Sequence, residues 1–197
     1  MQTIGLDLDN TLIDYAELFE VSAHAMGYFE QRQGRQRLAV RQALRMQPGG
    51  EARWQAVQAD VYGRRLKQAQ PADGAVDFLR HCVERSVRVV LISHKTQHAA
   101  ADRSLDLRQA ALDWLAEWSL DRWFTEDNVY FCCTRQQKLR RIADQACDVF
   151  IDDLRELLND GDFPPSTRGI WFCPGPERSQ QAGGYASFSE IDRSLFG

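Results

Sequence analysis

Residues 4–15 read IGLDLDNTLIDY, an apolar segment that carries polar side chains at alternate positions. In a β-strand every second side chain points to the same face, so Asp7, Asp9 and Thr11 would share one face. Three polar groups on one face are unsuited to a hydrophobic core, but they suit a site at the end of a strand. The segment therefore predicts a buried strand that leads directly into a functional site.

The composition is that of a globular protein, with 44% hydrophobic and 26% charged residues among 197. This length fits one domain with a modest insertion. We find no cationic leader and no apolar run of about 18 residues, and therefore expect no membrane partner. The five cysteines lack CxxC spacing, and the adjacent pair lies in the apolar run VYFCCT. We expect buried free thiols and hence a reduced, cytoplasmic compartment.

After residue 70, apolar runs alternate with amphipathic helical patterns. We predict strands over 87–93, 128–133, 147–153 and 168–173, each preceded by a helix. Continuous Val, Ile, Leu and Phe runs between amphipathic helices indicate a parallel sheet covered on both faces. The predicted fold class is α/β, a doubly wound, Rossmann-like sheet.

The segment 14–70 has a different pattern, with apolar residues at three- and four-residue spacing. Helical patterns run over 15–31, 36–46 and 51–69, separated by turn residues such as QPGG. We interpret this segment as a small α-helical cap, with Trp54 and Tyr62 in its core. The expected domains are an α/β core of residues 1–13 and 71–197 and a helical cap of residues 14–70.

Polar residues collect where the predicted strands end, in DLDNT, SHK, CCT and DD. Ligands of open parallel sheets bind beyond these carboxyl ends. The aspartates there would repel one another unless a cation lay among them: Asp7, Asp9, Asp152 and Asp153. A carboxylate-rich oxygen site suits Mg²⁺, and a carboxylate can also attack phosphorus. Ser93 and Lys138 would supply a hydroxyl and a positive charge to phosphoryl oxygens.

In their order along the chain, these motifs resemble the haloacid dehalogenase (HAD) superfamily of phosphatases. The first motif stands as IGLDLDNTLI and the second as VRVVLIS; Lys138 is the third, and the fourth, VFIDD, contains Asp152. Each motif alone can be explained without a function; for example, acidic residues often begin a helix, and a lysine is common on a helix surface. All four in the right order are a specific signal.

The resemblance implies a role for each matching acid. Asp7 corresponds to the nucleophile and a Mg²⁺ ligand, and Asp9 to the general acid/base, with its backbone carbonyl on the metal. Asp152 would bind Mg²⁺, and Asp153 would do so through water or from one layer further out.

The resemblance also implies substrate-binding residues. Ser93 and Lys138 would hold the phosphoryl group, and Thr11 would brace the turn after the strand. His94 departs from the small or amide residue common at its position, and it would either touch substrate or only fill space.

The expected activity is that of a Mg²⁺-dependent phosphatase. It would hydrolyse a small phosphorylated metabolite, a sugar phosphate or a nucleotide, through an aspartyl-phosphate intermediate. A phosphomutase or phosphotransferase with the same nucleophile is the alternative, and a non-catalytic binding module on the same fold is another. A dehalogenase is disfavoured because that chemistry needs no acid at the position of Asp9. A response-regulator receiver domain is excluded. In that family the acidic pair precedes the lysine along the chain, whereas here the lysine precedes the acidic pair.

Charge is unevenly distributed. The chain has formal net charge −4, yet residues 31–67 hold nine bases against two acids. This +7 balance suits either an anionic substrate or a solvated helix surface. A nucleic-acid surface is the weaker interpretation, because there is little aromatic interleaving around the bases. The sequence favours no particular oligomeric state.

Overall fold

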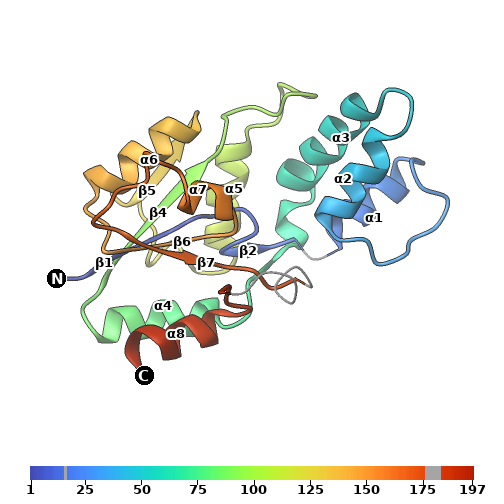
Figure 1. Cartoon of the computed structure of the whole chain (residues 1–197). Helices are drawn as coiled ribbons and strands as arrows, with labels where there is room; N and C mark the ends of the chain where they lie inside the picture. Colours follow the sequence, from blue (N-terminus) through green and yellow to red (C-terminus); the bar gives the residue numbers. More distant parts are fainter. Residues whose placement is uncertain (16, 176–182) are drawn as a thin grey trace. The chain divides into compact units, whose positions relative to one another are not determined.

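The computed structural model describes residues 1–15, 17–175 and 183–197, and the chain divides into two compact units (Figure 1). Unit 1 comprises Met1–Asp14, Pro71–Lys95 and Ser119–Gly197. Unit 2 comprises Tyr15–Gln70 and Thr96–Trp118. The second unit thus holds a segment, Thr96–Trp118, beyond the expected cap; the domain division itself stays a prediction.

Unit 1 contains a five-stranded parallel sheet of order β5-β4-β1-β6-β7 (Figure 1). Its strands are β1 (Thr3–Leu6), β4 (Arg88–His94), β5 (Val129–Cys132), β6 (Val149–Asp152) and β7 (Arg168–Trp171). The predicted doubly wound α/β fold class is therefore confirmed. The strand of the opening segment, β1, is central and buried along its whole length.

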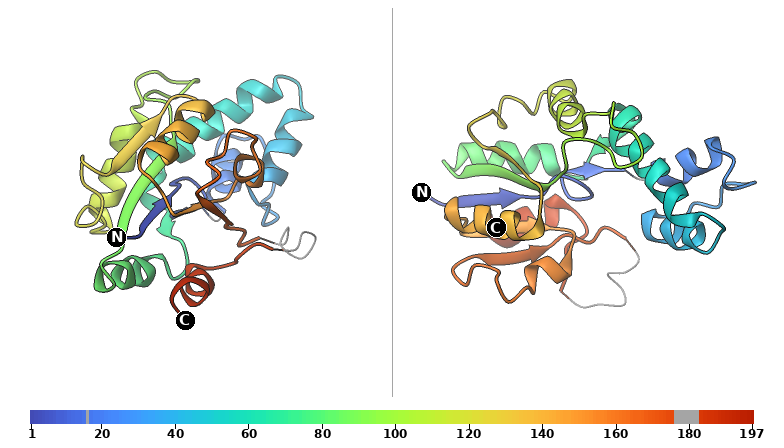
Figure 2. Two further views of the ribbon diagram at one scale, coloured as in Figure 1. Left: turned by 60° about the vertical axis from the view of Figure 1, so that its left-hand side comes forward. Right: turned by 90° about the horizontal axis from the view of Figure 1, so that it is seen from above.

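Helices cover both faces of this sheet (Figures 1 and 2). One face carries α4 (Ala75–Glu84) and α8 (Phe188–Phe196), where Phe188 packs against Phe78 and Phe172. The other carries α6 (Arg135–Asp144) and the short α7 (Arg155–Leu158). Two short strands, β2 (Ile13–Asp14) and β3 (Gln70–Pro71), form a separate pair.

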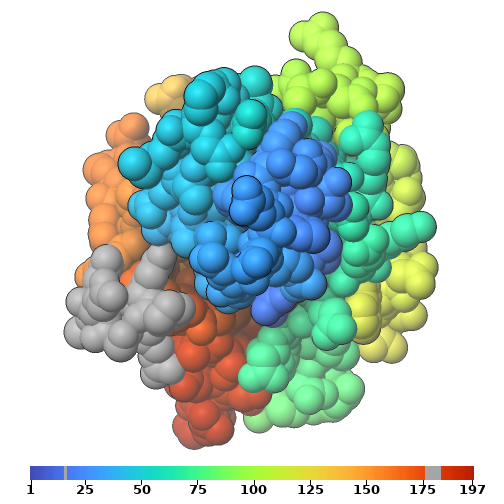
Figure 3. Space-filling model, turned by 90° about the vertical axis from the view of Figure 1, so that its right-hand side faces the viewer, coloured from blue at the N-terminus to red at the C-terminus, as the bar shows by residue number. Residues whose placement is uncertain are grey.

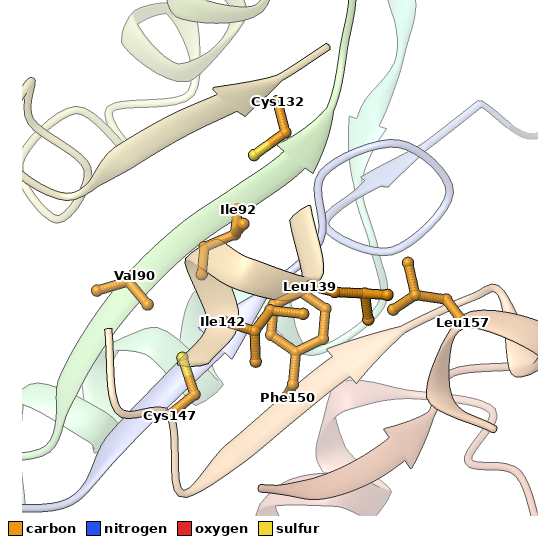
Figure 4. Close-up of a cluster of buried hydrophobic side chains, with 8 residues drawn as sticks. All are labelled: Val90, Ile92, Cys132, Leu139, Ile142, Cys147, Phe150 and Leu157. Atoms are coloured by element: carbon orange, nitrogen blue, oxygen red, sulfur yellow. The ribbon is translucent and has the colours of Figure 1, made fainter. Parts of the chain in front are cut away.

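A hydrophobic cluster fixes α6 against the sheet (Figure 4). It comprises Val90, Ile92, Cys132, Leu139, Ile142, Cys147, Phe150 and Leu157. Leu139 and Ile142 lie on α6 and contact the strands, and Phe150 of β6 is fully buried. Because Lys138 directly precedes Leu139, this packing also fixes the position of the Lys138 backbone relative to the sheet.

Unit 2 is helical, as its spacing predicted. Its elements are α1 (Leu18–Ala25), α2 (Arg37–Arg45), α3 (Gly50–Ala59), a π-helical turn (Asp60–Arg64), a 3₁₀ turn (Leu66–Gln68) and α5 (Leu107–Glu117). The pattern over 15–31 predicted too long a helix. Gly27, at φ +71°, ends it early, and the Tyr28 amide closes back on the Ala23 carbonyl at 2.9 Å.

Aromatic side chains form much of the interior of unit 2. Trp54 is buried and stacks on Phe19 with ring centroids 5.4 Å apart. Tyr62 meets Phe19 edge to face at 5.5 Å. Both residues therefore contribute to the core of this unit, as their sequence context suggested.

A buried carboxylate organises the loop between α1 and α2. Glu20 is fully buried and accepts hydrogen bonds from the backbone amides of Gln33, Gly34 and Arg35. The Arg35 guanidinium donates a further bond at 2.7 Å. Burial opposes the charge of Glu20, but these donors outweigh it and lower its pKa below the ordinary value.

All five cysteines are free thiols. Four are buried, as expected, but Cys133 is exposed because it follows the last residue of β5. None of the helices within the described ranges has the length and apolar character that a membrane span requires.

Gly5 provides a test of how tightly β1 is packed. A Cβ built there would lie 2.5 Å from Phe150 Cδ2 and 2.9 Å from Cys147 Sγ. We expect Gly5→Ala to lower the free energy of unfolding by roughly 1–3 kcal/mol, because fully buried Phe150 must move. Gly161→Ala is the matched control, since nothing lies within 4 Å of its added Cβ. Urea unfolding should separate the two variants; equal stabilities would show that the interior around β1 adapts freely.

Candidate active site

The chain turns sharply after β1, and this turn sets the positions of the first acids. The Asp7 amide donates to the Ile151 carbonyl at 2.9 Å, which carries the pairing with β6 one residue past Leu6. The turn then closes through a bond from the Ile13 amide to the Leu8 carbonyl, with Asn10 at φ +61°. Asp7 therefore lies at the carboxyl end of the central strand, where open sheets bind ligands.

Thr11 connects this turn to the end of β6. Its buried hydroxyl accepts a hydrogen bond from the Asp153 amide at 3.0 Å. The Asp153 carbonyl in turn accepts one from the Trp171 indole at 3.1 Å. The brace expected of Thr11 thus joins two loops that carry acids.

Lys138 lies between two carboxylates. Its Nζ is 2.6 Å from Asp7 Oδ1 and 2.6 Å from Asp152 Oδ2. The side chain is 1% exposed, so both interactions are shielded from water. Asp152 also accepts a bond from the Leu154 amide, which fixes its second oxygen. Residues 131 positions apart in the chain thus meet in one buried ion network.

The electrostatics of this network are unbalanced. Burial raises the pKa of Asp7 to about 7; Lys138 opposes this shift, and the charge of Asp152 adds to it. Burial disfavours the charge of Lys138 as well, but Asp7 and Asp152 outweigh it and raise the lysine pKa above its ordinary value. The ammonium therefore stays charged, and one ammonium cannot neutralise two carboxylates.

The same carboxylates suit a divalent cation. Oxygens of Asp7, Asp152 and Asp153 all lie within 4.8 Å of one another. The four predicted acids stand against two ammonium groups, those of Lys138 and Lys95, which leaves a formal charge of −2. Hard oxygen donors with this excess charge match the preferences of Mg²⁺. The residues present fit the metal that the sequence implied.

Ser93 and His94 lie near the end of β4. Leu91 pairs with Leu6, so buried Ser93 lies level with the residues that follow β1. His94 is exposed, and its Nε2 lies 3.1 Å from the Cys133 carbonyl oxygen. The register thus brings Ser93 to the edge of the sheet where the acids lie, while His94 contacts the residue after β5; their substrate-binding roles stay predictions.

Sequence reasoning missed Lys95. Its Nζ donates to both carboxylate oxygens of Asp9, at 2.9 and 2.7 Å. The residue is 3% exposed and directly follows β4. One signal was available: only three of the 24 basic residues are lysines, and one of them ends the SHK motif. Two of these three lysines contact the predicted acids; the third, Lys67, is exposed in unit 2.

Ion pairs in the structure neutralise part of the positive charge of the segment 31–67. Among the described residues, at least five of its bases form ion pairs: Arg32, Arg35, Arg45, Arg64 and Arg65. Three of the acids lie outside the segment, at Glu17, Glu20 and Asp102. Unit 2 as a whole has eleven bases and nine acids, a net charge of +2. Figure 3 shows, in blue and cyan, the surface that α1 to α3 contribute.

No protein-family model and no curated protein sequence matches the chain. Solved structures do match it over nearly the whole length. Protein Tyrosine Kinase A of Mycobacterium tuberculosis is 18% identical with a TM-score of 0.66, covering 100% of this chain and 98% of that one. A predicted phosphoglycolate phosphatase of Haemophilus somnus is 12% identical with a TM-score of 0.63, covering 98% and 97%.

A HAD-superfamily hydrolase of subfamily IA from Geobacter sulfurreducens is 14% identical with a TM-score of 0.59, covering 99% of this chain and 96% of that chain. At such identities the likeness establishes the fold. The parallel sheet, the strand order and these neighbours together show that the chain has the fold of the HAD superfamily of hydrolases.

Proposed function

We propose that this protein is a Mg²⁺-dependent phosphatase that hydrolyses a small phosphorylated metabolite through an aspartyl-phosphate on Asp7. The observation that carries the proposal is the buried Lys138 ammonium, 2.6 Å from both Asp7 and Asp152. A carboxylate held beside an ammonium at a strand end can approach a phosphate dianion without prohibitive repulsion. The phosphatase and hydrolase names of several structural neighbours agree with this activity.

In the first step, an oxygen of Asp7 bonds to phosphorus while the bond from phosphorus to the leaving oxygen breaks. Asp9 donates a proton to that leaving oxygen. Lys138 and Ser93 stabilise the charge on the phosphoryl oxygens. The step leaves a phosphoryl group on Asp7 and an ionised Asp9.

In the second step, Asp9 takes a proton from water, and the water oxygen bonds to phosphorus. The bond between phosphorus and Asp7 breaks, which releases phosphate and restores the Asp7 carboxylate. In a mutase or transferase, another hydroxyl would take the place of this water.

The acids that would hold Mg²⁺ are Asp7, Asp152 and Asp153, together with the Asp9 backbone carbonyl. The metal would supply positive charge to the phosphoryl oxygens and offset the formal −2 of the site. Thr11 holds the Asp153 amide, and so it keeps the last of these acids in place.

Substrate choice is assigned to the segment 14–70, the proposed cap. Since several of its arginines are engaged in ion pairs, selection would rest on polar groups and on shape rather than on a broad positive surface. A screen of phosphorylated metabolites with Mg²⁺, read by phosphate release, would identify the substrate class. Sugar phosphates and nucleotides are the first panel.

The two acids of the first motif should have separable functions. We expect Asp7→Asn to abolish the phosphoryl-enzyme, and Asp9→Asn to lower turnover by roughly 10²–10⁴-fold, the usual contribution of an acid/base group. Intact-protein mass spectrometry after rapid quenching checks both. A phosphoryl mass on Asp7→Asn, or normal turnover by Asp9→Asn, would contradict the assigned roles.

Metal binding should depend on pH. Since the pKa of Asp7 is raised to about 7, Mg²⁺ must displace a proton below that pH. The affinity should therefore rise from pH 6 to pH 7, by at most about tenfold per unit, and level off above pH 8. Calorimetric titration checks this, and Asp7→Asn should lose the dependence. Asp152→Ala should weaken binding at every pH. Full activity in excess EDTA would refute the metal requirement.

A further inference from the structure

We infer that Lys95 is a positioning residue that holds the carboxyl group of Asp9 in place for its proton transfers with the leaving group and with water; this inference rests on the proposed function. Lys95 belongs to none of the four motifs by which the site was predicted. Its assignment comes from the contact with both oxygens of Asp9.

The geometry suits a rigid support. The Lys95 amide donates to the Cys132 carbonyl at 3.0 Å, so its backbone continues the pairing of β4 with β5. The side chain is 2% exposed, and that of Asp9 is 18% exposed. A buried ammonium requires a carboxylate partner, so each group restricts where the other can lie. Groups placed on strands are held more exactly than groups on free loops.

Asp9 needs such support because it lies beyond the last residue of β1, in the turn that contains Asn10. Asp7, two residues before Asp9, forms a separate ion pair with Lys138. Two oxygens bound to one ammonium fix the plane of the carboxylate as well as its position. Lys95 thus binds Asp9, while Lys138 binds Asp7 and Asp152.

Both steps depend on where the carboxyl group of Asp9 lies. In the first step its proton must reach the leaving oxygen, and in the second its carboxylate must reach the water that hydrolyses the aspartyl-phosphate. In that step the water oxygen bonds to phosphorus, its proton passes to Asp9, and the bond from phosphorus to Asp7 breaks.

The test compares the two steps in Lys95→Met, with p-nitrophenyl phosphate and acetyl phosphate as probes in the presence of Mg²⁺. Their leaving groups need little protonation, so the first step should stay fast. We expect a first turnover close to that of wild type, then a steady-state rate lower by roughly 10- to 100-fold, as for a displaced catalytic group. A phosphoryl mass should accumulate on the protein. Lys95→Arg, which retains a cation with several donors, should recover part of the rate.

Arg140→Met is the matched control, because Arg140 is an exposed base on α6 of the same unit. It should behave as wild type. Circular dichroism and thermal melting establish which variants are folded; if Lys95→Met is not, Lys95→Gln replaces it, with the same expected accumulation.

The possible outcomes distinguish a failure of the positioning role of Lys95 from a failure of the proposed phosphatase activity. A folded Lys95 variant that slows both steps equally, or neither, overturns the positioning role while the phosphatase stands. A wild-type protein that releases phosphate from neither probe and shows no phosphoryl mass overturns both.

Discussion

The buried ammonium of Lys138 is the constraint on which the geometry of unit 1 depends. Removing a lysine charge from water costs several kcal/mol, and only close carboxylates offset that cost. Asp7 and Asp152 do so from two neighbouring strands, while the lysine comes from the helix above them. The apolar contacts of Leu139 and Ile142 fix the same helix. A shift of α6 by one turn would break the ion network and the core together.

This double constraint explains why the site belongs to the framework and not to its loops. Asp7 extends β1 by one residue, Asp152 ends β6, and Thr11 ties the two loops together. The chemistry that we propose asks for fixed charges around a moving phosphoryl group, and fixed charges need rigid elements. The closely packed Gly5, directly before Leu6 on β1, belongs to the same design.

Much of this site could be predicted because the physical rules involved are local. Apolar runs mark the strands, and parallel strands gather their carboxyl ends at one edge. That reasoning brought Asp7, Thr11, Asp152 and Asp153 to one place, whereas Lys138, on a helix, was assigned through the resemblance to the third motif. The length of α1 was misjudged because its apolar spacing continues beyond Gly27, whose backbone conformation ends the helix.

Pairing between distant residues was the part that the sequence did not reveal. Lys95 meets Asp9 across 86 positions, and no rule of spacing predicts such a contact. The same limit made the segment 31–67 look more cationic than it is, because Glu17, Glu20 and Asp102 neutralise three of its arginines from outside. Charge counted along a chain overstates the charge that a folded surface presents.

The scarcity of lysine has a practical consequence for spectroscopy. With three lysines in the whole chain, selective isotope labelling of that amino acid would give a spectrum with three ammonium signals. Two of them would come from buried groups, each bound to a carboxylate and protected from rapid exchange with solvent. Exposed Lys67 would exchange quickly and serve as an internal reference. The protein therefore contains its own reporters, one on Asp7 and one on Asp9, with no foreign probe attached.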